Sequence, residues 1–139
     1  MNLENFSFNE LVEVRFAIEV EIVKMAAKRR TIDDIVVLTN ALSAFEKKVA
    51  EGAKAVEENT WFYLKIADAA KNNTLKSLIL LISSKSLKFY KEQKLKDNLS
   101  LLVEKNQLIL DHIIYQKSDI AIQMMKEQFR RNQYQELCF

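Results

Sequence analysis

Two oppositely charged side chains, Arg15 and Glu19, stand in a segment that is otherwise rich in large apolar residues. The segment runs FNELVEVRFAIEVEIVKMAAKRR from Phe8 to Arg30. On a helix that turns about 100° per residue, its apolar side chains cover well over half of the circumference. A helix that is apolar on most sides is packed on most sides, so we expect Arg15 and Glu19 to point into the protein. The apolar side chains are Leu11, Val12, Val14, Phe16, Ile18, Val20, Ile22, Val23 and Met25.

A buried guanidinium is strongly unfavourable without a partner, which leaves two ways to neutralise Arg15. One is Glu19, four residues later, in a pair within the helix whose head groups reach the rim of the protein. The other is a bound anion, which a guanidinium can hold through paired hydrogen bonds. This helix alone leaves both alternatives open.

Four neutral hydrogen-bonding side chains also stand at the centres of apolar helical stripes. Asn59 and Tyr63 are four residues apart and share one helix face, while Asn106 and Gln128 each stand among leucine, isoleucine, methionine or phenylalanine neighbours. A buried polar group without a hydrogen bond costs about 1–3 kcal/mol. We therefore expect these four side chains to meet one another, Arg15, water or a ligand, and to line a small polar pocket.

The composition indicates that helices position these residues. The chain has 139 residues, 49% of them hydrophobic, with one glycine and no proline, which suits a single all-α domain. Ser7 before Glu10 and Thr31 before Asp34 are typical capping boxes, and polar breaks divide the rest. We predict an antiparallel bundle of about six helices. The breaks are Glu51-Gly52-Ala53, Asn72-Asn73-Thr74, Lys96-Asp97-Asn98 and Gln116-Lys117-Ser118, with Ser118 as the N-cap of the last helix.

The charge pattern and the single cysteine exclude several classes of protein. The net charge of +2 does not argue for nucleic-acid binding, and the cluster from Lys28 to Arg30 suits a helix C-terminus. The longest uncharged run, from Ser77 to Ser84, is far below the ~20 residues of a membrane span, and the first residues do not show the basic and then apolar pattern of a signal peptide. Cys138 can build neither an internal disulfide nor a cysteine metal site. We expect a cytoplasmic protein without a membrane partner.

The sequence offers no catalytic constellation. It contains no glycine-rich phosphate loop, no nucleophile elbow and no general base within the polar stripes, so we predict that the chain is not an enzyme. The one histidine, His112, falls on the helix side opposite Asn106. We interpret it as a surface or interface residue.

Four segments together resemble the FCD domain, the effector-sensing C-terminal domain of FadR-type GntR transcription regulators. The resemblance covers nearly the whole chain, and the order of the segments is more specific than any one of them. It rests on ELVEVRFAIEVEIVKMAAKRRT (Glu10 to Thr31), WFYLKIADAAKNNTL (Trp61 to Leu75), NQLILDHI (Asn106 to Ile113) and AIQMMKEQF (Ala121 to Phe129).

The resemblance implies a helical bundle around a small-molecule pocket, where many relatives hold a divalent metal with one aspartate and three histidines. The aspartate position corresponds to Asn59, and the histidine positions correspond to Tyr63, Asn106 and Gln128. Amides and a phenol are poor substitutes for these ligands on zinc, nickel or manganese, so we expect no metal and no other cofactor. Arg15 takes the place of an arginine that faces the effector in relatives, which favours the bound anion.

These observations predict a ligand-sensing and dimerising domain over residues 9–137, preceded by a linker remnant over residues 1–8. The expected ligand is a small organic acid or acyl-type molecule held by Arg15, Asn59, Tyr63, Asn106 and Gln128. We expect a homodimer that reaches DNA only through a winged-helix domain, which would need about 70 further residues and is absent from this chain. The alternative is a helical dimerisation or interaction protein whose internal polar side chains form a closed network.

Overall fold

The computed structural model describes residues 7–53, 55–82, 99–117 and 123, and every regular element within these ranges is helical. The elements are α1 (Phe8–Arg29), α2 (Ile32–Ala50), α3 (Val56–Ala69) and α5 (Leu99–Tyr115), with a further helix over residues 73–82. The all-α prediction is confirmed. The count of about six helices stays a prediction, because the expected last helix from Ser118 lies outside the described residues.

Local hydrogen bonds begin the first two helices where the sequence predicts. The Ser7 hydroxyl oxygen accepts from the backbone N–H of Glu10 at 3.1 Å, and the hydroxyl donates to the Glu10 carboxylate at 2.9 Å. Thr31 and Asp34 form a complete capping box, in which each side chain accepts from the backbone N–H of the other residue. These caps fix where α1 and α2 begin, and the buried apolar side chains of α1 then set which of its sides faces the interior.

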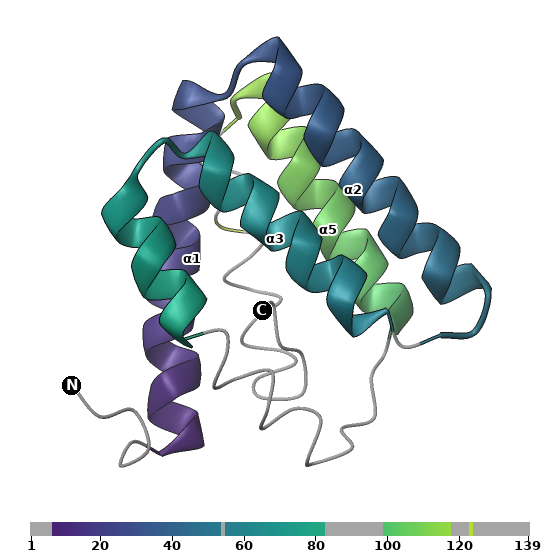
Figure 1. The fold of residues 1–139 in the computed structure, drawn as a ribbon, viewed down its shortest axis with the longest axis horizontal. Coiled ribbons are helices and arrows are strands. Elements are labelled where there is room, and N and C mark those ends of the chain that lie inside the picture. The colour runs from purple at the N-terminus through teal and green to yellow at the C-terminus, as the bar shows by residue number, and fades with distance from the viewer. Residues whose placement is uncertain (1–6, 54, 83–98, 118–122, 124–139) are drawn as a thin grey trace.

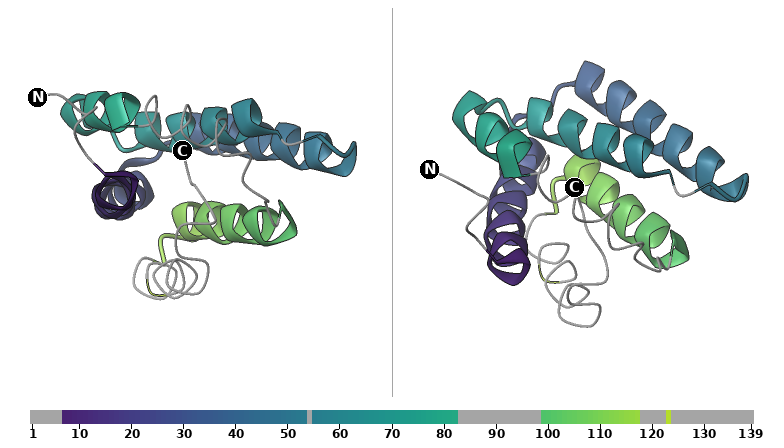
Figure 2. Two further views of the ribbon diagram at one scale, coloured as in Figure 1. Left: turned by 90° about the horizontal axis from the view of Figure 1, so that it is seen from below. Right: turned by 60° about the horizontal axis from the view of Figure 1, so that its bottom comes forward.

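Three of the helices run side by side, and α1 crosses them. In Figure 1, α2, α3 and α5 share one diagonal direction, while α1 stands apart at a steep angle. The left view of Figure 2 shows α1 nearly end-on, with α2 and α3 in one layer and α5 below that layer. The interior of the protein is thus enclosed between the α2–α3 layer, α5 and the crossing helix α1.

The C-terminal ends of α1, α3 and α5 meet at the junction between α1 and α2. Arg29 Nη1 donates to the Ala70 carbonyl oxygen at 3.0 Å, at the end of α3. Arg30 donates from Nε to the Ile113 carbonyl oxygen at 3.2 Å and from Nη2 to that of Ile114 at 2.8 Å, in the last turn of α5. The last carbonyls of a helix lack partners within it and carry partial negative charge, so the two arginines stabilise both ends.

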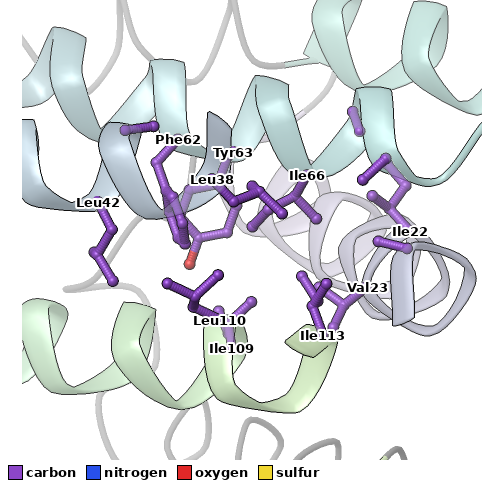
Figure 3. Packing of buried hydrophobic residues seen from close by; sticks show 14 of the residues in the cluster. Ile22, Val23, Leu38, Leu42, Phe62, Tyr63, Ile66, Ile109, Leu110 and Ile113 are labelled. Atoms are coloured by element: carbon purple, nitrogen blue, oxygen red, sulfur yellow. The ribbon is translucent and has the colours of Figure 1, made fainter. Parts of the chain in front are cut away.

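The apolar core draws on all four labelled helices. Val23, Leu38, Phe62 and Ile109 come from α1, α2, α3 and α5 and are each 0% exposed. Figure 3 shows these side chains gathered between the α2–α3 layer and α5, with the Tyr63 ring reaching from α3 toward α5. None of the helices described here combines the length and the apolar character that a membrane span requires.

Candidate functional site

The charged pair of α1 is buried, as its place on the helix predicts. Arg15 and Glu19 are each 1% exposed. They lie one turn apart on the same side of α1, since four residues advance the helix by slightly more than one full turn of about 3.6 residues. Neither head group reaches the rim of the protein, so the rim arrangement considered from the sequence is wrong.

Glu19 pairs with a cation from another helix. Lys105 Nζ of α5 lies 3.8 Å from Glu19 Oε1, and the Lys105 side chain is 6% exposed. The same ammonium lies 5.7 Å from the centroid of the Tyr63 ring, where the electron-rich face of the ring favours a positive charge. Among the described residues, Arg15, Glu19 and Lys105 thus bring three charged side chains into the interior, each at most 6% exposed.

Three of the four neutral polar residues form a hydrogen-bonded chain between α3 and α5. The Tyr63 hydroxyl donates to Asn106 Oδ1 at 2.9 Å, and Asn106 Nδ2 donates to Asn59 Oδ1 at 2.7 Å. Tyr63 and Asn106 are 0% exposed and Asn59 is 6% exposed. The expectation that these side chains meet one another is confirmed for these three residues, while Gln128 lies outside the described residues.

Lys105 joins the charged pair of α1 to the chain of neutral groups, because its ammonium approaches both Glu19 and the Tyr63 ring. Sequence reasoning did not single out this lysine. A signal was present, since Leu102 and Ile109 stand three residues before it and four residues after it, on the same helix face, and both are buried. A lysine between such neighbours is on the core side of its helix.

The expectation of a surface or interface His112 is wrong. His112 is 2% exposed, and its Nδ1 lies 2.6 Å from the carbonyl oxygen of Lys117, just beyond the end of α5. The chain turns back there through Gln116, whose φ is 57°, and this turn covers the imidazole. The helical wheel placed the ring opposite Asn106 but carried no information about the segment that packs over that side.

The comparison with family models decides the class of the protein. The model of the FCD domain matches residues 10–131, which includes every residue of the candidate site. The chain belongs to the FCD domain family. FCD domains are the effector-binding domains of GntR-type transcription regulators, so the polar interior lies in a domain of the sensing class.

A curated relative agrees with this FCD assignment. The chain is similar to the HTH-type transcriptional regulator LutR of Bacillus subtilis (strain 168), with 32% identity over 85 residues. The matched part is 61% of this chain and 39% of LutR. The chain therefore corresponds to about two fifths of the length of that regulator.

The residues of this FCD domain do not fit the divalent metal that many relatives hold. The oxygens of Asn59 and Asn106, at two of the four ligand positions, already accept hydrogen bonds from Asn106 and Tyr63. Within the described residues, no three His, Cys, Asp or Glu side chains gather as a metal site would require. Neutral amides and a phenol lack the charge and basicity of carboxylate and imidazole ligands.

Proposed function

We propose that this chain is the ligand-sensing and dimerisation domain of a GntR-type transcription regulator, with residues 9–137 as the sensing domain. Its ligand is a small organic acid or acyl-type molecule bound without a metal. The observation that carries the proposal is the buried guanidinium of Arg15, 1% exposed, on the same side of α1 as Glu19 and its partner Lys105. A buried guanidinium suits an anionic ligand, because charged hydrogen bonds are stronger in an interior that excludes water.

The neutral groups beside the charges suit the same ligand. Asn59, Tyr63 and Asn106 offer hydrogen bonds without adding charge, and Gln128 is proposed to complete the set. Arg15 then binds the acid group through paired hydrogen bonds, as guanidinium groups do with carboxylates. The ligand stabilises one arrangement of the bundle, and through it one spacing of two DNA-binding domains in a homodimer. Such a regulator acts on DNA in the cytoplasm, which is the location we propose.

Analysis of copurified small molecules tests this proposal. Native mass spectrometry of the chain gives its assembly, and chromatography of the denatured sample identifies any acid released. The proposal expects a dimer with a bound acid, and expects Arg15→Gln to lower the affinity for that acid at least about tenfold, the loss of one charged hydrogen bond. Lys28→Gln, an exposed change on the same helix, is the control. An Arg15→Gln affinity within about twofold of wild type would show that Arg15 does not hold the acid.

A second candidate is a helical dimerisation or interaction protein that binds no effector. The observation that favours it is the hydrogen-bonded chain of Tyr63, Asn106 and Asn59, because polar groups that satisfy one another need no ligand. In this case the native mass equals that of the polypeptide assembly alone. Arg15→Gln then changes only the free energy of unfolding, because the protein binds no effector.

A further inference from the structure

The carboxylate of Glu19 is buried without hydrogen-bond donors. The residue is 1% exposed, and neither Oε1 nor Oε2 accepts a hydrogen bond within the part of the chain that the structure describes. Lys105 Nζ balances the charge from 3.8 Å, which is beyond the roughly 2.7–2.9 Å of a charged hydrogen bond. Two acceptor oxygens are therefore withdrawn from water while their capacity to accept is unused.

The neutral donors of Tyr63 and Asn106 are engaged in the chain between α3 and α5. The hydroxyl hydrogen of Tyr63, whose ring lies under Lys105, is donated to Asn106 Oδ1. Asn106 Nδ2 donates to Asn59 Oδ1. The chain between α3 and α5 thus consumes donors that could otherwise have turned toward Glu19.

Arg15 and Glu19 offer opposite chemistry at a short separation. Four residues of helix rise about 6 Å, so a guanidinium donor and a carboxylate acceptor face the same interior within the length of a small molecule. Two points of opposite charge recognise a molecule with an acidic group at one place and a hydrogen-bond donor at another. The donor chemistry that matches a buried carboxylate is a hydroxyl or an ammonium group.

We propose that Glu19 is a specificity-determining residue of the effector site, and that the effector is a short acid that also carries a hydroxyl or ammonium group. The acid group binds Arg15 and the donor binds Glu19. Lys105 is a positioning residue, whose ammonium lies 3.8 Å from Glu19 Oε1 and holds the carboxylate on the inner side of α1. This inference rests on the proposed sensing function and adds the hydroxyl or ammonium group of the ligand and the residue that binds it.

Titration calorimetry with matched acids tests the inference. The probes are two trios that differ only in the donor: succinate, malate and aspartate, and acetate, glycolate and glycine. Wild type is expected to bind a hydroxy or amino member at least about tenfold more tightly than the unsubstituted acid of the same trio, the effect of one charged hydrogen bond. Glu19→Gln should lower the affinity for that member about tenfold and leave the unsubstituted acid within about twofold, which also shows that the variant is folded.

A double variant covers the case in which Glu19→Gln leaves Lys105 buried without an anion and does not fold. Glu19→Leu with Lys105→Met removes both charges and keeps similar volumes, a replacement that proteins often tolerate or gain stability from. The double variant should fold and should bind the three members of each trio with equal affinity.

The outcomes separate the two proposals. Equal affinities of wild type for all members of a trio overturn the role of Glu19 and leave the sensing function intact. Retention of the donor preference in the double variant also overturns it. If no acid of either trio binds wild type more tightly than it binds Arg15→Gln, the role of Glu19 in binding a short acid is overturned, while the sensing function is decided separately by the copurified acid.

Discussion

Tyr63 joins α3 to α5 by a direct hydrogen bond. Its hydroxyl donates to Asn106 at 2.9 Å, with both side chains 0% exposed. Tyr63→Phe keeps the ring under Lys105 but leaves the Asn106 oxygen without this donor, so we expect the free energy of unfolding to fall by about 1–2 kcal/mol. Urea denaturation measures this change. Tyr115→Phe, at a position that is 66% exposed, should stay within about 0.5 kcal/mol of wild type.

The neutral side chains of Asn59, Tyr63 and Asn106 predict that divalent metals do not stabilise the protein. The amide oxygens are already hydrogen-bonded, and a metal that binds only the folded state would raise the melting temperature. We expect the melting temperature to change by less than about 1 °C with chelator or with equimolar zinc or nickel. A rise of several degrees that saturates at one metal per chain would contradict this expectation.

Helical periodicity located Arg15, Glu19, Asn59, Tyr63 and Asn106 in the interior, since each interrupts a stripe of apolar residues. Periodicity says which side of a helix is buried, but it does not say which residues meet across the interface. The partner of Glu19 is Lys105 of another helix. A pair between Glu19 and Arg15 within α1 was equally consistent with the sequence. Lys105 escaped notice because lysine is so often a surface residue, although its neighbours marked the position.

At the scale of the helices, Arg30 ties the end of α1 to the end of α5. It makes two hydrogen bonds to the last turn of α5 from the junction of α1 and α2. Arg30→Ala removes both hydrogen bonds and leaves the partly buried carbonyls of Ile113 and Ile114 without these donors. We therefore expect the free energy of unfolding to fall by about 2 kcal/mol. Urea denaturation provides the value, and hydrogen exchange should quicken in the last turn of α5. Lys28→Ala, an exposed change in the same turn of α1, is the matched control.

The start of α2 predicts a dependence of stability on pH. Burial alone would raise the pKa of the Asp34 carboxyl, but hydrogen bonds from Lys71 and Thr31 outweigh it and hold this pKa below its ordinary value of 3.8. A pKa that is lower in the folded state stabilises the fold above the unfolded-state pKa, and the contribution is lost as the pH falls through the folded-state pKa.

Asp34→Asn should therefore be less stable than wild type at neutral pH, and the two should converge as the pH is lowered through and below about 4. Urea denaturation from pH 7 to pH 2.5 follows this convergence. Asp33→Asn changes an exposed carboxylate of the same turn and should stay within about 0.5 kcal/mol of wild type at neutral pH. A difference between Asp34→Asn and wild type that stays constant over this range would exclude the ion pair with Lys71 as its cause.

The elements also show where sequence reasoning stops. The starts of α1 and α2 followed from the caps at Ser7 and Thr31, and the end of α2 followed from Gly52, because these signals are local. The start of α3 at Val56 did not, since its N-cap, Ala55, makes no side-chain hydrogen bond. The steep crossing of α1 did not, since the crossing angle depends on how side chains of different helices interlock. The contacts of Arg29 and Arg30 with the ends of α3 and α5 were equally hidden, because a basic cluster at a helix end has the same sequence pattern whether it meets solvent or other helices.

In the molecule as a whole, the junction of α1 and α2 ties one end of the bundle. Gln116 Nε2 donates to the carbonyl oxygen of Ala27 at 2.8 Å, in addition to the contacts of Arg29 and Arg30. A ligand between α1 and α5 would act on helices that are fixed to each other at this end. We therefore expect its effect to be largest toward the N-terminal end of α1, where a preceding DNA-binding domain would be attached.

The same contacts bear on whether this chain can read DNA by itself. Arg29 and Arg30 are adjacent basic residues at the end of α1, and both are engaged with carbonyl groups of the protein rather than offered to phosphates. The net charge is only +2, and the FCD match takes up residues 10–131 of the 139. Sequence-specific binding needs phosphate contacts to position the protein and an element that reaches base edges.

We therefore expect the isolated chain to select no DNA sequence. Incubation with a random duplex library, recovery of bound DNA and sequencing should give the same base frequencies as the input. Any retention should disappear between 50 and 200 mM salt, as nonspecific phosphate binding does. A recovered palindromic motif would mean that the FCD domain itself contacts bases, and that DNA recognition in this regulator does not depend on a separate winged helix.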